Sequence, residues 1–338
     1  MSRNIFRSFL AAITTLFLVM AVGWGTADAA RTIKLAHVVN DKDGFHIAAL
    51  KFKELVEEKT KGEIKIEIYP NASLGDERTL LEGMQIGTID MGVITNGPVA
   101  NFYPKIAVFE LPFFFGSREE AYGVLDGVIG QKLLKNLQEI RLAGLAYAER
   151  GFRNLTNSKR AVNSPADIKG LKIRVMENPV YIDTFKALGA NAVPMAWTEC
   201  LTALQQGTID GQENPVNVIY AFKLYQSQKY LSMTRHTYAP ALFVMSLKLY
   251  GSLAPEVQAV LTDAASQAAK HERKWNAEQE KGQLKVLADE GMKVDIQAPG
   301  AYEQRPLAHE SKNTRKPGTR RVGHRLGLHG HVGILRPA

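Results

Sequence analysis

Arg174 stands near the end of a short segment in which apolar and charged residues alternate. Ile173 and Val175 flank it, and this period of two is typical of a strand with one buried face. Asn178 and Pro179 end the strand, because proline cannot donate a ladder hydrogen bond. Ligands of open α/β sheets bind beyond the carboxyl ends of strands, and arginine can grip a carboxylate with two parallel hydrogen bonds. The segment predicts a carboxylate-binding arginine, with an exposed arginine on an edge strand as the alternative.

The same reasoning places four more residues at the rim of one cleft: Arg153, Trp197, Glu213 and Asn214. Two arginines, an amide and an aromatic ring suit a small organic anion, and they supply no obvious nucleophile or general base. The sequence contains no G-x-S-x-G, H-E-x-x-H, Walker or G-x-G-x-x-G motif. A binding protein is therefore favoured over an enzyme.

Composition and charge indicate a globular protein that does not bind nucleic acid. The chain has 338 residues, a length sufficient for two domains. Its 45% hydrophobic and 22% charged residues are typical of a globular protein. Its net charge of +8 comes mostly from residues 304–338, where eight lysines and arginines face Glu310 alone. The rest of the chain is close to neutral, so a basic nucleic-acid surface on the folded body is not expected.

The first 29 residues have the pattern of an export signal. Arg3 and Arg7 precede an apolar stretch at residues 9–22, and residues 27–29 fit a small-x-small cleavage site. That stretch is shorter than the roughly 20 residues that a membrane-spanning helix needs. We expect a signal peptide over residues 1–29, cleavage near Ala29 and Ala30, and a mature protein in the periplasm.

Neither cysteine nor histidine predicts a metal site or a cofactor. Cys200 is the only cysteine, so an intrachain disulfide is excluded, and a small apolar filler is a more usual role for it than a nucleophile. The histidines of the last segment have no helical or strand register, which argues against metal binding: His309, His324, His329 and His331.

The N-terminal half predicts alternating strands and helices. A strand at 32–38, an amphipathic helix at 47–61 and a strand at 64–68 predict a parallel pair with a helical crossover. The segments that follow are a helix at 76–86, a strand at 89–95, a loop at 96–98, an aromatic stretch at 102–115 taken as core beneath a loop, and a helix at 119–140.

An internal echo predicts two lobes of similar build. Residues 81–90 recur as residues 201–210 in the pattern Leu-x3-Gln-x-Gly-Thr-Ile-Asp, which is a helix end, a glycine stop and a strand start. The alternative is chance similarity of a common junction. The second lobe would hold a strand at 142–147, an N-cap at Ser164, helices at 180–188 and up to 206 with Thr198 as cap, and a helix at 255–290 long enough to cross both lobes, with a break suggested at Gly282.

Several blocks of the chain resemble the periplasmic solute-binding subunits of TRAP transporters, the DctP type. The resemblance runs from about residue 31 to residue 300. The blocks that carry it are Leu-Gly-Asp-Glu-Arg at 74–78, Ile-Arg-Val at 173–175, Pro-Met-Ala-Trp-Thr-Glu at 194–199, and Ala-Leu-Gln-Gln-Gly-Thr-Ile-Asp-Gly-Gln-Glu-Asn-Pro at 203–215, whose last six residues are the most specific.

This resemblance implies an α/β fold of the two-lobed periplasmic binding protein kind, type II-like, with a cleft between the lobes and a long helix spanning both. Residues 31–150, joined by 240–279, would form lobe I, and residues 151–239, joined by 280–302, would form lobe II. The protein would be a monomer without a cofactor, close on its ligand by a hinge, and deliver that ligand to a two-subunit TRAP permease driven by an ion gradient.

Site roles also follow from the resemblance. It implies that Arg174 forms the salt bridge to the substrate carboxylate, with Asn214 at the same carboxylate and Arg153 as a second contact. Trp197 would pack beside the ligand. Weaker matches imply contacts from the first lobe at Glu77, Asn96, His37 and Phe45. For Glu77, a carboxylate favoured by the helix dipole is an equal alternative.

Residues 303–338 depart from the family, whose members usually end in a further helix packed on the body. This basic, patternless tail is interpreted as disordered or as the product of a frameshift, which reading the gene in its other two frames tests. A ligand sensor that feeds a signalling receptor and an exported enzyme on a similar scaffold are the alternative functions. The acid itself stays open, because C4-dicarboxylates, sugar acids and other hydroxy or keto acids all fit an arginine clamp.

Overall fold

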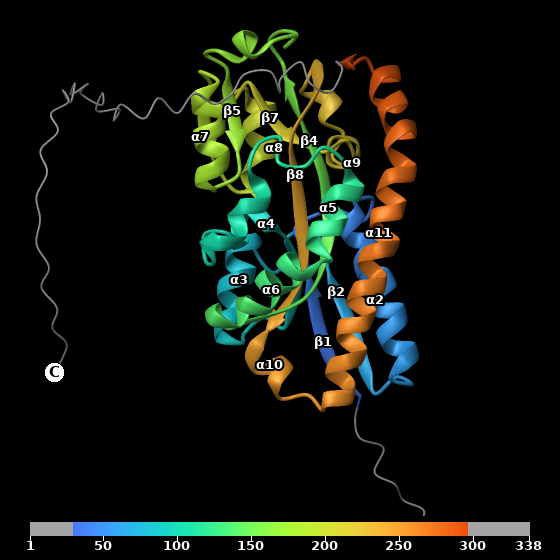
Figure 1. Cartoon of the computed structure of the whole chain (residues 1–338). Coiled ribbons are helices and arrows are strands. Elements are labelled where there is room, and N and C mark those ends of the chain that lie inside the picture. The colour runs from blue at the N-terminus through green and yellow to red at the C-terminus, as the bar shows by residue number, and fades with distance from the viewer. Residues whose placement is uncertain (1–29, 297–338) are drawn as a thin grey trace, which may run out of the picture. The chain divides into compact units, whose positions relative to one another are not determined.

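The computed structural model describes residues 30–296, which form one mixed sheet flanked by helices (Figure 1). The sheet has nine strands in the order β2-β1-β3-β8-β4-β7-β5-β6, and β9 pairs with β8. The expected signal peptide and the basic tail lie outside the described residues. The strands are β1 Arg31–Ala36, β2 Ile64–Tyr69, β3 Met91–Thr95, β4 Leu142–Asn157, β5 Lys172–Val175, β6 Asn191–Pro194, β7 Gly211–Asn214, β8 Tyr230–Ser246 and β9 Lys293–Asp295.

The first strand–helix–strand unit confirms the predicted parallel pair. β1 and β2 run parallel, and α2, Gly44–Lys59, is the crossover between them. Ile33 and Leu35 of β1 are fully buried, as the alternating pattern predicted. The helix begins three residues earlier than predicted, because the Asp43 side chain accepts a hydrogen bond from the Phe45 backbone amide and caps it.

Two parallel groups of three strands have the same topology. In one, β1 lies between β2 and β3; in the other, β5 lies between β6 and β7. Helix α3 (Glu77–Ile86) precedes β3, and helix α8 (Trp197–Gln206) precedes β7. Both helices end at a glycine in the left-handed conformation, Gly87 and Gly207. The internal echo is therefore confirmed as two lobes of similar build, here called lobe I around β1 and lobe II around β5.

Two long antiparallel strands, β4 and β8, run through both lobes (Figure 1). The sequence predicted a strand only over residues 142–147. Gly151 has φ +108°, and the β4–β8 register shifts there, yet β4 continues to Asn157. Both expected lobe borders, 150/151 and 239/240, fall inside these shared strands, so the lobes are joined by sheet.

The long helix α11, Pro255–Asp289, crosses from one lobe to the other, as predicted. Its N-terminal part packs into the lobe I core through Leu261 and Ala265, and Leu287 packs into a separate core in lobe II. The break suggested at Gly282 is wrong, because the helix is continuous there. Lobe II has two smaller apolar clusters where lobe I has one large one.

Four local predictions are corrected. The helix expected at 119–140 is three segments, α5 (Arg118–Leu125), α6 (Val128–Asn136) and η2 (Leu137–Ile140), because Gly127 is extended and starts a new helix. Residues 96–98 belong to the short helix α4, Asn96–Val99. Ala196, not Thr198, precedes α8 as its N-cap. The aromatic stretch is only partly core, since Phe113 and Phe114 are 38% and 44% exposed.

The remaining helices are α7 Pro179–Ala187, α9 Val216–Ala221 and α10 Leu247–Gly251, with the 3-10 segments η1 Pro104–Glu110, η3 Pro165–Ile168 and η4 Leu224–Gln226. Ser164 caps η3 as predicted, in a reciprocal box with Asp167. Asn178 caps α7, with Pro179 in its first turn. Among the helices of residues 30–296, none is long and apolar enough to cross a bilayer.

Candidate functional site

A cavity of about 30 Å³ lies between the lobes and brings together three of the predicted site residues, Glu77, Arg174 and Trp197. By volume it holds only a few waters, since each needs about 10–15 Å³. Lobe I contributes Val38, Asp76, Glu77, Arg78, Pro98 and Asn101 to its lining, and lobe II contributes Arg174, Met176, Glu177, Met195, Ala196 and Trp197.

Arg174 reaches the cavity because it is the third residue of β5 and the strand ends directly after it. Its Nε and Nη2 donate to the Met195 carbonyl at 2.9 and 2.7 Å, and its guanidinium lies 5.7 Å from the centre of the Trp197 ring. The residue is only 3% exposed, and no carboxylate of residues 30–296 forms an ion pair with it. The guanidinium is thus fixed in direction while its charge has no carboxylate partner.

Glu77 and Trp197 each begin a helix beside the cavity. Glu77 is the first residue of α3, and its Oε1 accepts a hydrogen bond from the Thr95 backbone amide at 2.6 Å. Trp197 is the first residue of α8 and packs edge-on against Phe222, with ring centres 4.9 Å apart. Its buried indole Nε1 has no hydrogen-bond acceptor within the described part of the chain. Leaving a buried N–H donor without an acceptor is costly. An acceptor atom of a bound ligand would remove that cost.

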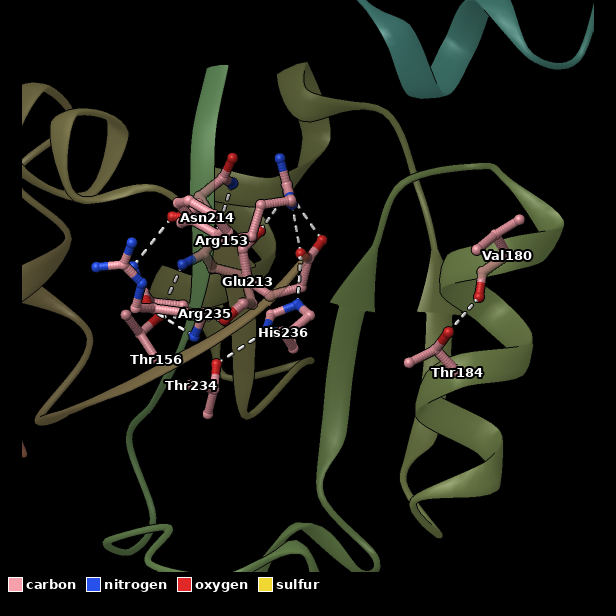
Figure 2. Close-up of polar contacts among 12 residues, drawn as sticks. Arg153, Thr156, Val180, Thr184, Glu213, Asn214, Thr234, Arg235 and His236 are labelled. Carbon is pink, nitrogen blue, oxygen red and sulfur yellow. Dashed lines mark hydrogen bonds and ion pairs between the residues drawn. The ribbon is translucent and has the colours of Figure 1, made fainter. Parts of the chain in front are cut away.

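Arg153 lies apart from the cavity lining, in a fully buried ion pair with Glu213 (Figure 2). Its Nη2 donates to Glu213 Oε1 at 2.8 Å, and its Nε donates to Oε2. His236 Nε2 lies 3.2 Å from the same Oε2, and Thr234 Oγ1 lies 2.8 Å from His236 Nδ1. Burial favours the neutral carboxyl, but the Arg153 charge and the hydrogen bonds from His236 and Arg153 outweigh it and hold the pKa of Glu213 below its usual value.

Asn214 is also buried outside the cavity lining, at the end of β7. Its amide Nδ2 donates to Gln212 Oε1 at 2.6 Å, and its backbone pairs with Asn154 of β4. All four residues of β7 are buried although three are polar. The predicted rim set is therefore divided in this structure: Arg174 and Trp197 face the cavity, while Arg153, Glu213 and Asn214 form a buried layer on the neighbouring strands.

The other three weaker matches in lobe I, Asn96, His37 and Phe45, are buried and do not line this cavity. Asn96 donates its Nδ2 to Glu110 Oε1 at 2.9 Å. His37 Nε2 lies 3.1 Å from His46 Nδ1, and burial, with a smaller effect of the His46 and Arg150 charges, lowers the pKa of His37 to about 3.

Phe45 packs in the lobe I core. The Arg150 guanidinium lies 4.2 Å from the centre of its ring. Arg150 in turn forms a buried ion pair with Asp43. Phe45 therefore lies beneath an arginine that already has its own counter-charge.

Several lining residues were not predicted as site residues, notably Arg78, Asn101, Met176 and Glu177. Arg78 directly follows the predicted Glu77 in sequence, so adjacency was an available signal for it. Glu110 was also missed; it is fully buried, and a single carboxylate within the aromatic stretch was the signal that could have found it.

Within residues 30–296, no group of three or more histidine, cysteine, aspartate or glutamate side chains could hold a metal ion. Cys200 is buried in the lobe II core, and burial raises the pKa of its thiol to about 11. A thiol with so high a pKa is a poor nucleophile at neutral pH, which agrees with the role of an apolar filler.

Two lobes on a shared sheet, with a directed arginine between them, define a solute-binding protein. The chain belongs to the DctP family, bacterial extracellular solute-binding protein family 7, whose model matches residues 35–307. The similar proteins and solved structures are solute-binding proteins, not enzymes.

Similar proteins include the 2,3-diketo-L-gulonate-binding periplasmic protein YiaO of Escherichia coli, 37% identical over 82% of this chain and 85% of that protein. A TRAP solute-binding protein from Bordetella, with density interpreted as pantoate, is 41% identical with a TM-score of 0.79, over 81% of this chain and 91% of the other. One from Polaromonas bound to D-erythronate is 39% identical with a TM-score of 0.78, over 80% and 89%.

Proposed function

We propose that this protein is a periplasmic receptor that captures a small organic acid through Arg174 and delivers it to a TRAP-type permease. One observation carries the proposal. Four arginines of residues 30–296 are buried, and Arg150, Arg153 and Arg273 each have a carboxylate partner, whereas Arg174 has none. A buried charge without a counter-charge is costly, and a ligand carboxylate in the inter-lobe cavity would supply that counter-charge.

The cavity chemistry favours an acid with one carboxylate and several hydroxyl or keto groups. Asp76, Glu77 and Glu177 line the same cavity as Arg174, so a second carboxylate would meet like charge. Hydroxyl groups can donate to these carboxylates, and a keto or hydroxyl oxygen can accept from the Trp197 indole. The acids named for the three similar proteins, 2,3-diketo-L-gulonate, pantoate and D-erythronate, each carry one carboxylate.

Capture requires the lobes to separate, because the cavity is smaller than any of these acids. The shared strands β4 and β8 are the natural hinge, since their register shifts beside Gly151. Closure would remove water from the Arg174–carboxylate pair, where a charge-assisted hydrogen bond is stronger than in water.

A thermal-shift panel tests the ligand class. Purified protein is heated with D-erythronate, pantoate, D-galactonate, succinate or malate, since a ligand that binds only the folded state raises the melting temperature. The proposal expects a concentration-dependent rise with at least one hydroxy monocarboxylate and little effect of the dicarboxylates. A larger rise with succinate would overturn the monocarboxylate assignment, and no rise with any acid of a wider library would overturn acid capture.

Uptake in the native bacterium tests delivery. Deleting the gene should abolish uptake of the labelled acid that binds in the panel, and deleting the TRAP membrane subunits should abolish it equally. Restoring the gene with Arg174→Ala should leave uptake absent although the protein accumulates in the periplasmic fraction. Normal uptake without the membrane subunits would instead favour a receptor that only senses the acid.

A further inference from the structure

The two lobes touch directly at one edge of the inter-lobe cavity. The amide Nδ2 of Asn178, in lobe II, donates to the backbone carbonyl of Gly97, in lobe I, at 3.0 Å. In the reverse direction, Nδ2 of Asn101, in lobe I, donates to the backbone carbonyl of Glu177, in lobe II. These paired bonds join α4 and the turn after it to the turn between β5 and α7.

Gly97 allows this close approach. A Cβ atom at this position would lie 2.8 Å from Met176 Cε and 3.1 Å from its Sδ, closer than carbon and sulfur atoms pack. Met176 is 5% exposed and belongs to the lobe II core. A larger side chain at residue 97 would therefore have to displace the end of the Met176 side chain for the lobes to approach as closely.

This contact closes one side of the cavity that contains Arg174. Pro98 and Asn101 line that cavity from lobe I, and Met176 and Glu177 line it from lobe II. Because each bond has its donor in one lobe and its acceptor in the other, neither bond survives separation of the lobes. The contact is thus formed in the closed arrangement alone.

The residue type at 178 points to the same role. Asn178 Oδ1 caps α7 by accepting from the Val180 backbone amide at 2.8 Å, a task that serine or aspartate performs equally well. Only asparagine among these N-cap residues also carries a free amide donor. That donor is the group that reaches across to Gly97.

We propose that Gly97, Asn101, Met176, Glu177 and Asn178 form a latch that holds the lobes closed and sets how long a bound acid stays. The latch shifts the protein toward the closed arrangement before any acid binds, and it slows reopening afterwards. The second effect rests on the proposed function, whereas the first does not. Each bond should change the closed-to-open ratio by roughly fivefold, the effect of an ordinary hydrogen bond.

The first test uses no ligand. Spin labels at Val128→Cys in lobe I, 87% exposed, and Lys159→Cys in lobe II report the distance between the lobes, while the buried Cys200 stays unlabelled. Wild-type protein should show a short-distance population by pulsed EPR, and Asn178→Ser, which keeps a capping side chain, should reduce it. Asn136→Ser serves as the control. It removes the hydrogen bond that the Asn136 side-chain amide donates to the Tyr103 hydroxyl inside lobe I, and it should leave the distances unchanged.

Two further variants sharpen this test: a bulky side chain at residue 97, here called the wedge, and the same side chain with room made for it at residue 176. Gly97→Leu should shift the distances to the long population, because its side chain collides with Met176. Adding Met176→Ala opens space for that side chain and should restore the short population. A wild-type protein with only the long distance, or a wedge variant with unchanged distances, would overturn the latch.

The second test measures residence time with D-erythronate by stopped-flow tryptophan fluorescence. Asn178→Ser should raise the dissociation rate of D-erythronate about fivefold, with a smaller change in the association rate, and Asn136→Ser should match wild type. An unchanged dissociation rate in Asn178→Ser would contradict the second effect of the latch. If D-erythronate and the wider acid library all fail to bind, the proposed function fails while the ligand-free distances still decide the first effect.

Discussion

Lobe I and lobe II build the same junction from the same residues, yet they continue it with opposite chemistry. After α3 and after α8, a left-handed glycine is followed by a threonine whose backbone amide bonds back to the helix. Asp90 Oδ2 then accepts from the Lys34 amide at 2.8 Å, and Asp210 Oδ2 accepts from the Lys172 amide at 2.9 Å. The next strand is Met-Gly-Val-Ile-Thr in lobe I and Gly-Gln-Glu-Asn in lobe II.

Both of these strands are fully buried, so burial does not explain the difference between them. Lobe I shows that the junction folds with an apolar strand. The polar residues of β7 are therefore not required by the scaffold, and keeping them buried needs the compensation that Arg153 and His236 provide. The equivalent strand β3 has no buried charged residue. Lobe II is therefore the lobe that holds the buried charged layer.

The largest predicted effect tests this difference between β7 and β3. Glu213 and Val93 occupy equivalent positions, three residues after Asp210 and Asp90. Glu213→Ala leaves Arg153 buried without its counter-charge and should lower the free energy of unfolding by about 3–5 kcal/mol. Val93→Ala should cost about 2 kcal/mol through lost apolar burial.

Chemical denaturation measures both variants. Glu213→Leu combined with Arg153→Met removes both charges and should recover most of the loss, because the cost comes from the unpaired charge. A double variant as unstable as Glu213→Ala would show that β7 needs its ion pair for folding itself, which contradicts the comparison.

A smaller effect, about 3 kcal/mol, concerns Glu110, a buried carboxyl of lobe I whose pKa is shifted in the opposite direction to that of Glu213. Burial raises the pKa of Glu110 in lobe I to about 7, since hydrogen bonds to its charged form and the Arg153 charge offset burial only in part. Glu110 protonates in the folded state more readily than in the unfolded state. Its contribution to stability is therefore fully present below pH 4.5 and is lost as the pH rises to 7.

Glu110→Gln should remove this contribution, so stability should fall less between pH 4.5 and 7 than in wild type. Urea unfolding at a series of pH values measures the slope. Glu139→Gln, an exposed carboxyl in the same lobe, should keep the wild-type slope. Equal slopes for wild type and Glu110→Gln would show that Glu110 ionises normally in the folded protein.

The smallest effect tests what the lobes share. Asp90→Ala and Asp210→Ala each remove one carboxylate acceptor of a strand amide, so each should cost about 1 kcal/mol. The two losses should agree within a few tenths of a kcal/mol when measured by thermal unfolding. A loss confined to one lobe would mean that the echoed sequence does not serve the same structural role in both.

Local sequence patterns predicted the parts of the fold that local physics decides. The alternation at Ile173 and Val175 gave β5, and the glycine at 207 gave the end of α8, because both depend on neighbouring residues alone. The continuation of β4 through Gly151 was missed, since it depends on pairing with β8, more than seventy residues away in the chain.

The site, like the fold, could be predicted from the sequence only in part. The strand pattern and the family motifs indicated Arg174, and the structure places it in the inter-lobe cavity. Its distinguishing feature, the absence of a carboxylate partner in residues 30–296, could not be read from the chain. The partners of Arg153 and Arg150 are 60 and 107 positions away, so only the fold shows which arginines are already neutralised.

Isothermal titration calorimetry of Arg174→Ala with the acid identified in the thermal-shift panel tests the central claim most directly. Arg160→Ala serves as the control, because Arg160 is exposed in lobe II and donates only to backbone carbonyls. Binding should weaken by about 2–5 kcal/mol in Arg174→Ala, should weaken in Arg174→Lys, which keeps the charge but loses the fork, and should match wild type in Arg160→Ala. Wild-type affinity in Arg174→Ala would contradict the carboxylate clamp.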